Sequence, residues 1–74
     1  MTSKQDEFVR KEIGAKIKEI REKKNLTQEE IAQKAKMTAN YYAKIERGII
    51  GTAPEKLYKI FKALGVEASD IFPH

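Results

Sequence analysis

Cysteine and tryptophan are absent from this sequence of 74 residues, and histidine occurs once, at the last position. Without cysteine, the chain can form neither disulfides nor thiolate metal sites. His74 alone cannot build a histidine metal site, so we expect no bound metal and no cofactor. The fold must therefore be held by an apolar core, at a length near the lower limit for one stable domain.

Long apolar runs are also absent. No run approaches the roughly 18 residues of a membrane span, and the N-terminus lacks a signal-peptide pattern. These absences predict a cytoplasmic protein with no membrane partner. Charged residues make up 35% of the chain and hydrophobic residues 41%, which is typical of a small globular domain. The net charge of +4 and the pI of about 9.4 favour a polyanionic partner but do not say which one.

Two stretches have apolar residues at helical spacing, and no stretch alternates like a strand. The first stripe consists of Val9, Ile13, Ile17 and Ile20. The second consists of Leu57, Ile60, Phe61 and Leu64. Gly14 lowers the helix propensity of the first stripe by about 1 kcal/mol relative to Ala, which indicates close packing at that point. Asn25 follows this helix and tolerates the left-handed conformation of a helix end.

Start and stop signals divide the middle of the chain into two short helices, at about 28–35 and 39–47. Thr27 and Glu30 form a capping box before the first, and Thr38 is the cap of the second. Gly48 supplies the stop. A further start is predicted at Thr52, two residues before a proline. We therefore expect an all-α domain of four to five helices over residues 8–74, preceded by a disordered tail at 1–7.

The two short helices are joined by little more than Lys36-Met37. Such a short connection prevents them from lying antiparallel and predicts the steep crossing of a helix-turn-helix. In that motif the second helix lies in the major groove of DNA while the first crosses the backbone. Helix N-termini, such as those after Thr27 and Thr38, also favour phosphate.

Three segments carry a resemblance to a known family. They are IGAKIKEIREKKNLTQEEIAQKA at 13–35, IERG at 45–48 and LYKIFKALGV at 57–66. From Ile13 to Phe72, the sequence resembles the DNA-binding domain of the Cro and phage-repressor (XRE) family of transcriptional regulators. The resemblance implies a five-helix fold and operator binding as a dimer.

The resemblance also implies roles for individual residues. Gln28 matches a phosphate contact, and Arg21 and Glu46 match a charge pair that ties the first helix to the recognition helix. The base-reading positions of the family are occupied here by Ala39, Asn40 and Lys44. The sequence departs from the family pattern in two places. Lys36 stands where a glycine is usual, and Ile49-Ile50-Gly51 replaces a loop that is commonly basic.

Each candidate DNA contact has an alternative. Asn40 can bond adenine or a phosphate, or remain solvated, and Lys44 can reach guanine, a phosphate or water. Ala39 offers a methyl group for thymine, or simply permits close approach. Further phosphate contacts are predicted for Lys18, Thr38, Tyr41 and Arg47, with plain surface positions as the alternative.

Apolar residues in loops and near the chain end leave a second choice open. Tyr42, three residues before Ile45, is predicted to face the core, whereas the adjacent Tyr41 points about 100° away. The apolar residues in the loop after the second short helix and near the chain end either close the core or form a dimer patch. They are Ile49, Ile50, Ile71 and Phe72.

Taken together, these patterns predict a sequence-specific transcriptional regulator, a repressor or controller, that binds an inverted repeat in double-stranded DNA as a homodimer. No nucleophile–base pair, metal set or phosphate-binding glycine loop is present, so we do not expect an enzyme, and no small-molecule ligand is expected. The alternative is an interaction or antitoxin-type module of the same fold with weak or no operator binding.

Overall fold

The computed structural model describes residues 4–71, which contain five helices and no strand. In chain order these are α1 (Lys4–Lys23), α2 (Gln28–Lys34), α3 (Ala39–Glu46), α4 (Pro54–Leu64) and α5 (Ala68–Ile71). The predicted all-α class is therefore confirmed. The two short central helices also form where the caps predict them, and each ends one residue earlier than expected.

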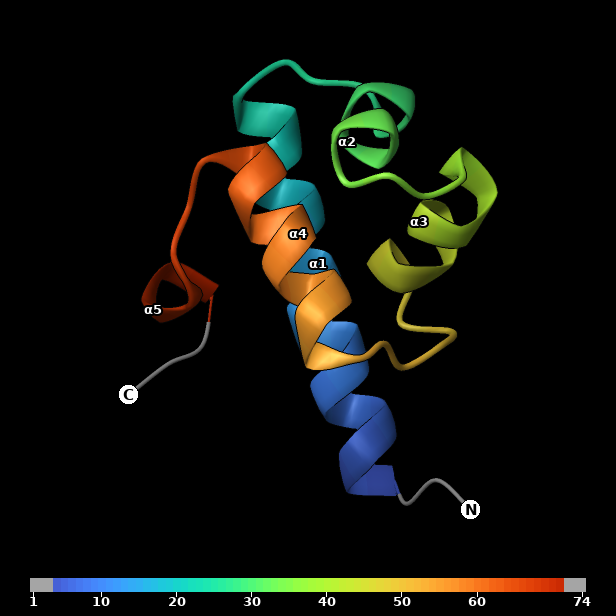
Figure 1. Cartoon of the computed structure of the whole chain (residues 1–74). Helices are drawn as coiled ribbons and strands as arrows, with labels where there is room; N and C mark the ends of the chain where they lie inside the picture. The colour runs from blue at the N-terminus through green and yellow to red at the C-terminus, as the bar shows by residue number, and fades with distance from the viewer. Residues whose placement is uncertain (1–3, 72–74) are drawn as a thin grey trace.

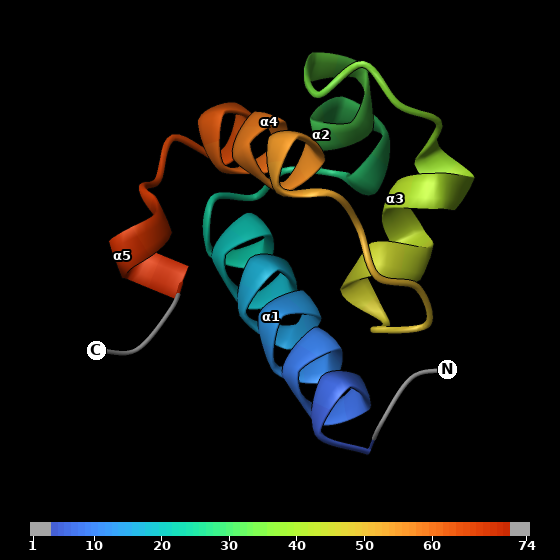
Figure 2. The same cartoon turned by 60° about the horizontal axis from the view of Figure 1, so that its bottom comes forward.

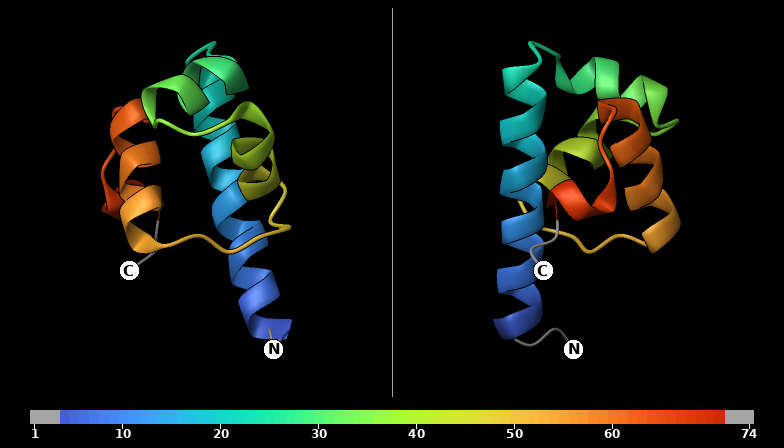
Figure 3. Two further views of the ribbon diagram at one scale, coloured as in Figure 1. Left: turned by 45° about the vertical axis from the view of Figure 1, so that its right-hand side comes forward. Right: turned by 90° about the vertical axis from the view of Figure 1, so that its left-hand side faces the viewer.

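The four shorter helices lie on one side of α1, as the right-hand view of Figure 3 shows. Helix α3 packs against α1 and α2, α4 packs against α2, and α5 packs against α1. In Figures 1 and 2, α3 and α5 lie on opposite sides of the molecule. The first turns of α1 extend beyond the other helices (Figure 1). One face of α3 and the N-terminal part of α1 are consequently left uncovered.

Helix α1 begins earlier than the sequence pattern predicts. Residues 4–7, expected to belong to a disordered tail, form its first turn. Two local interactions account for this start. Asp6 and Glu7 place negative charge at the positive end of the helix dipole. Glu7 also forms an ion pair with Lys11 one turn later, with 3.0 Å between the Glu7 Oε1 and Lys11 Nζ atoms.

Each of the first four helices contributes at least one fully buried large side chain to the core, and these are Ile17, Ile31, Tyr42, Ile60 and Leu64. Burying an isoleucine or aromatic side chain of this size contributes about 1.5–3 kcal/mol. Two small residues, Ala32 of α2 and Ala35 at its C-cap, are also buried and let α3 and α4 approach closely. Ile71 of α5 closes the core at its far end.

Four helix ends share one pattern of backbone hydrogen bonds around a residue at positive φ. The positive-φ residues are Asn25 (57°), Lys36 (59°), Gly48 (71°) and Gly65 (75°). At the end of α2, for example, the Lys36 N–H donates to the Gln33 carbonyl and the Met37 N–H to the Ala32 carbonyl. This arrangement satisfies carbonyls that the helix leaves without partners. Lys36, at the position where a glycine is usual in the family, therefore adopts the left-handed conformation.

The start of α4 corrects one prediction. Thr52 was expected to cap this helix, but the capping residue is Ala53, which makes no side-chain cap. Pro54 at the first helical position favours the helix start by its fixed φ and leaves one fewer N–H without a partner. The Lys56 N–H, which a capping side chain would engage, donates to the Ala53 carbonyl at 3.0 Å. The Thr52 hydroxyl instead lies 3.4 Å from the Tyr41 hydroxyl. None of the described helices is long and apolar enough to cross a membrane.

Candidate nucleic-acid interface

Helix α3 presents a polar face to solvent. Asn40, Lys44 and Arg47 are all exposed, and spacings of four and three residues place them on one side of the helix. The Thr38 hydroxyl accepts a hydrogen bond of 3.1 Å from the Tyr41 N–H, so the predicted cap is confirmed. Ala39 is half-buried and packs against the core. An amide and two cations are therefore available on a face that no other described element covers.

The opposite face of α3 is held tightly against α1. Gly14 makes this possible, because a Cβ atom at residue 14 would lie 2.5 Å from the Ile45 carbonyl oxygen and closer still to that of Glu46. Gly48 lies equally close to Lys11. The close packing expected at Gly14 is confirmed, and its partner is the C-terminal turn of α3. The helix that carries the exposed face is thus held by close backbone packing against α1.

A buried carboxylate fixes the same end of α3. The Glu46 side chain is 2% exposed, and Arg21 donates to both of its oxygens, from Nε at 2.6 Å and from Nη2 at 3.2 Å. Gln28 adds a bond of 3.0 Å from its amide to Glu46 Oε1. Arg21 also donates to the Leu26 carbonyl, at 2.7 Å. The pairing of Arg21 with Glu46 is as expected; the parts played by Gln28 and Leu26 were not predicted.

These contacts also decide the charge state of the cluster. Burial by itself would raise the pKa of the Glu46 carboxyl, but the hydrogen bonds from Arg21 and Gln28 outweigh it, and the pKa lies below its ordinary value. The bond to Glu46 raises the pKa of Arg21. Burial, with the neighbouring Glu46 charge, raises the pKa of the Tyr42 phenol, whose hydroxyl has no hydrogen-bond partner among the described residues. At neutral pH the cluster is one carboxylate facing one guanidinium.

The adjacent tyrosines point in different directions, as predicted. Tyr42 is fully buried, whereas Tyr41 is half-buried and turns toward α4. The Lys56 ammonium lies 4.7 Å from the centroid of the Tyr41 ring, and the bond from Thr52 lowers the pKa of the Tyr41 phenol. Sequence patterns missed Lys56 and Thr52, because both meet α3 through tertiary contacts across the loop at 47–53. Tyr41 thus joins the exposed face of α3 to the start of α4.

Two of the expected phosphate contacts lie beside α3. Lys18 is exposed and follows Gly14 by one helical turn, so it lies on the side of α1 that borders α3. Gln28 is half-buried at the first position of α2, and one of its two amide N–H groups is engaged with Glu46. Lys18 and Gln28 thus belong to the two helices that pack against α3.

The four apolar residues that were assigned either to the core or to a dimer patch do not all have the same environment. Ile71 is 6% exposed and Ile50 is partly buried, and both pack in the core, so for them the core alternative is the correct one. Ile49 is 55% exposed. Phe72 lies outside the described residues.

The fold and this face together define a small helix-turn-helix DNA-binding domain. Residues 17–71 match the family model described as helix-turn-helix, and the chain belongs to this family of DNA-binding transcriptional regulators, of the Cro and phage-repressor (XRE) type, which are not enzymes. The immunity repressor protein of Bacillus phage phi105 is 37% identical over 59 residues, which are 80% of this chain and 41% of that protein. The control protein C.BamHI of Bacillus amyloliquefaciens is 37% identical over 60 residues, which are 80% of this chain and 74% of that protein.

Solved structures agree with this assignment. The clp gene regulator ClgR of Corynebacterium glutamicum superposes with a TM-score of 0.82 at 28% identity, over 85% of this chain and 82% of that one. The restriction-modification controller protein C.AhdI of Aeromonas hydrophila superposes with a TM-score of 0.81 at 27% identity, over 84% and 94% of the two chains. The chain spans less than half of the phage repressor and most of the length of these other proteins.

Proposed function

We propose that the protein regulates transcription by binding an operator, an inverted repeat in double-stranded DNA, as a homodimer. The observation that carries this proposal is the exposed face of α3, where Asn40, Lys44 and Arg47 stand together on a helix anchored by a buried ion pair. A recognition helix must keep its orientation relative to the rest of the domain to read bases reproducibly. Control of a phage, plasmid or restriction–modification system fits the named relatives.

Base reading would rest on Ala39, Asn40 and Lys44. An asparagine can bond adenine through both its amide groups, and a lysine can donate to guanine. The half-buried Ala39 leaves room for the helix to approach the bases and offers a methyl contact to thymine. Half-sites about 34 Å apart would let both subunits read the same side of the duplex.

Phosphate contacts would hold α3 in register. The second N–H of the Gln28 amide remains to donate to a phosphate while the first holds Glu46. The other candidates border the face of α3 and are Lys18, Thr38, Tyr41 and Arg47. Four more cations strengthen the positive field along the groove between α2 and α4, namely Lys34, Lys36, Lys59 and Lys62.

Selection of bound duplexes from a random pool tests the proposal. We expect one recovered motif with two-fold symmetry, and we expect Asn40→Ala to relax preference at one position per half-site, at a loss of about 1–3 kcal/mol. Gln33→Ala is the control, because Gln33 is an exposed amide on α2. Recovery of no motif, with Asn40→Ala and Gln33→Ala behaving alike, would contradict the proposal.

One observation favours the alternative of a protein-interaction module. Ile49 is 55% exposed in the loop after α3, at a place where a basic residue would contact phosphate. Titration of labelled protein with random-sequence duplex at low salt separates the two functions. A regulator binds such DNA weakly and in a salt-sensitive way, whereas a module that has lost DNA binding does not bind it at all.

A further inference from the structure

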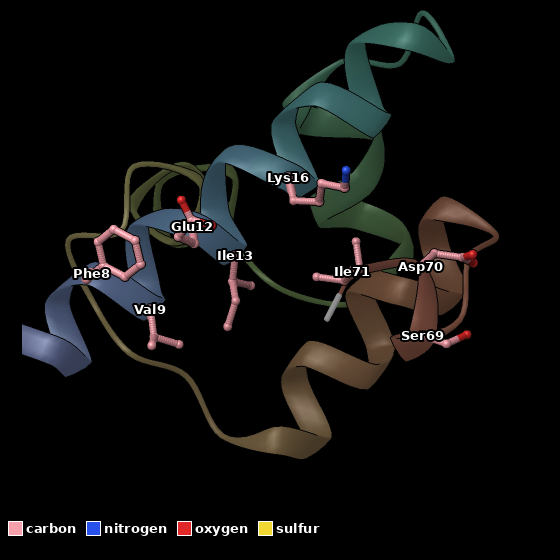
Figure 4. Close-up of a pocket in the computed structure, with 8 residues that line it drawn as sticks. All are labelled: Phe8, Val9, Glu12, Ile13, Lys16, Ser69, Asp70 and Ile71. Atoms are coloured by element: carbon pink, nitrogen blue, oxygen red, sulfur yellow. The ribbon is translucent and has the colours of Figure 1, made fainter. Parts of the chain in front are cut away.

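The N-terminal half of α1 and helix α5 enclose a groove of about 430 Å³ whose floor is apolar. We call it the α1–α5 groove, lined by Phe8, Val9, Ile13 and Ile71 (Figure 4). Phe8 is 64% exposed and Val9 49%, which are high values for residues on a helix that carries a core stripe. Both belong to the N-terminal half of α1, whose first turns extend past the other helices (Figure 1). Contiguous exposed apolar surface of this kind marks an interaction site.

The groove is also edged by unpaired charges of both signs. Three Glu–Lys pairs at i, i+4 spacing follow one another along α1. Two of them close as ion pairs, Glu7–Lys11 at 3.0 Å and Glu19–Lys23 at 3.2 Å. The middle pair, Glu12 and Lys16, lies on the groove and forms no ion pair with any described residue. A second acid on the groove, Asp70, accepts a hydrogen bond of 2.9 Å from the Glu67 N–H. Glu12 and Lys16 are therefore the charged side chains of the groove that no described residue engages.

We infer that the α1–α5 groove is the surface through which two copies of this chain associate. Both signs of charge beside one apolar floor make the surface complementary to itself, as a two-fold interface requires. An axis passing between Glu12 and Lys16 pairs each of these residues with the other one in the second copy. Phe8 and Val9 of each copy then cover the apolar floor of the other.

The position of the groove suits this role. Helices α3 and α5 lie on opposite sides of the molecule, so association through the groove leaves the polar face of α3 open (Figure 2). The inference rests on the homodimer in the proposed function and specifies its surface. Of the four residues first expected to form a dimer patch, Ile71 lies in the floor of the groove, to which the exposed Phe8 and Val9 are now added.

Sedimentation equilibrium of the full chain over a range of concentrations tests the apolar part. We expect a dimer, and we expect Phe8→Glu to weaken it by about 30-fold or more, as for the loss of a central aromatic contact. Tyr58→Glu is the matched control, because Tyr58 is an aromatic residue of α4 with nearly the same exposure, 61%. Its dimer should match the wild type. Circular dichroism verifies that both variants fold.

Reversing the charges of Glu12 and Lys16 tests the ionic part of the proposed interface. Glu12→Lys and Lys16→Glu should each weaken the dimer, and the double variant should restore it, because the two charges then pair again across the axis. A dimer that Phe8→Glu and Tyr58→Glu affect equally would overturn the inference, as would a double variant no tighter than the single ones.

The DNA function and the dimer surface can fail separately. A wild-type protein that binds a selected operator yet stays monomeric at every concentration overturns the groove and leaves DNA binding intact. A wild-type dimer that is sensitive to Phe8→Glu but binds no DNA supports the groove and contradicts the proposed function. Where both hold, Phe8→Glu should bind a single half-site as tightly as the wild type and lose the gain from the second half-site.

Discussion

Glu46 shows how one residue can set the orientation of a helix. Its carboxylate is nearly inaccessible to water, a condition that is costly unless the charge is fully compensated. Arg21 of α1 and Gln28 of α2 both supply that compensation from outside α3. Because the bidentate bond has strict geometry, the C-terminal turn of α3 has one favourable position relative to both helices. Rotation of α3 would leave a buried charge without its partners.

The stability that Glu46 contributes should depend on pH. We expect Glu46→Gln to lower the free energy of unfolding by about 1.5–3 kcal/mol near pH 7, the range for a hydrogen bond to a charged group. Folding lowers the pKa of Glu46, so this contribution is fully present above the ordinary value of 4.5 and is lost as pH falls through the folded-state pKa. The difference between wild type and variant, measured by urea unfolding, should therefore shrink as the pH falls below 4.5.

Glu19→Gln is the control for that measurement. Glu19 pairs with Lys23 in the open, and exposed pairs of this kind contribute about 0–1 kcal/mol. Its variant should stay close to the wild type at neutral and at acid pH. An effect of Glu46→Gln that is the same at acid and neutral pH would show that charge is not what Glu46 supplies.

At the scale of the elements, the crossing of α1 and α3 depends on the absence of a side chain at residue 14. We expect Gly14→Ala to destabilise the fold by about 1–2 kcal/mol, because overlap with backbone carbonyls outweighs the gain in helix propensity. Gly51→Ala is the matched control, since a Cβ there would meet Arg10 Cδ at an ordinary 3.4 Å. Denaturant unfolding compares the two. A Gly14→Ala variant as stable as the wild type would show that the crossing can relax.

Helix starts and stops were predictable wherever the signal is local. The capping box of Thr27 and Glu30 closes as expected, with bonds of 3.0 and 2.8 Å, because both partners lie within one turn. The left-handed Asn25 and Lys36 follow from equally short-range signals. The predicted cap at Thr52 was wrong because the contact of this residue is not local. Its hydroxyl lies next to Tyr41, eleven residues earlier, and that contact depends on how α3 and α4 pack.

The candidate site was predictable in part for the same reason. Helical spacing alone puts Asn40, Lys44 and Arg47 on one face, so their exposure follows from the pattern. The bond between Gln28 and Glu46 joins residues eighteen positions apart and requires the fold to be known. The exposure of Val9 was likewise hidden, because a residue in an apolar stripe is expected to be buried, and the extension of α1 past its neighbours has no sequence signal.

At the scale of the whole molecule, the charged surface near α3 and the apolar α1–α5 groove lie apart from each other. Helix α3, with its exposed cations, lies on one side of the molecule, and α5, which borders the α1–α5 groove, lies on the other (Figures 1 and 2). A protein with a net charge of +4 gains most of its affinity for any duplex from phosphate neutralisation, whatever the sequence. Affinity and sequence preference should therefore respond to different substitutions, and salt distinguishes them.

Lys18 is the residue on which this distinction can be tested most cleanly, because it borders α3 without belonging to it. We expect Lys18→Ala to weaken binding to specific and random duplexes by the same factor, and to reduce the slope of log affinity against log salt by about 1. Lys23→Ala on the same helix is the control, because Lys23 is paired with Glu19 and should leave the slope unchanged. Fluorescence anisotropy over a salt series gives both slopes. If Lys18→Ala alters the preferred sequence while the slope stays constant, Lys18 contacts bases, and the division between a reading helix and a phosphate-binding flank is wrong.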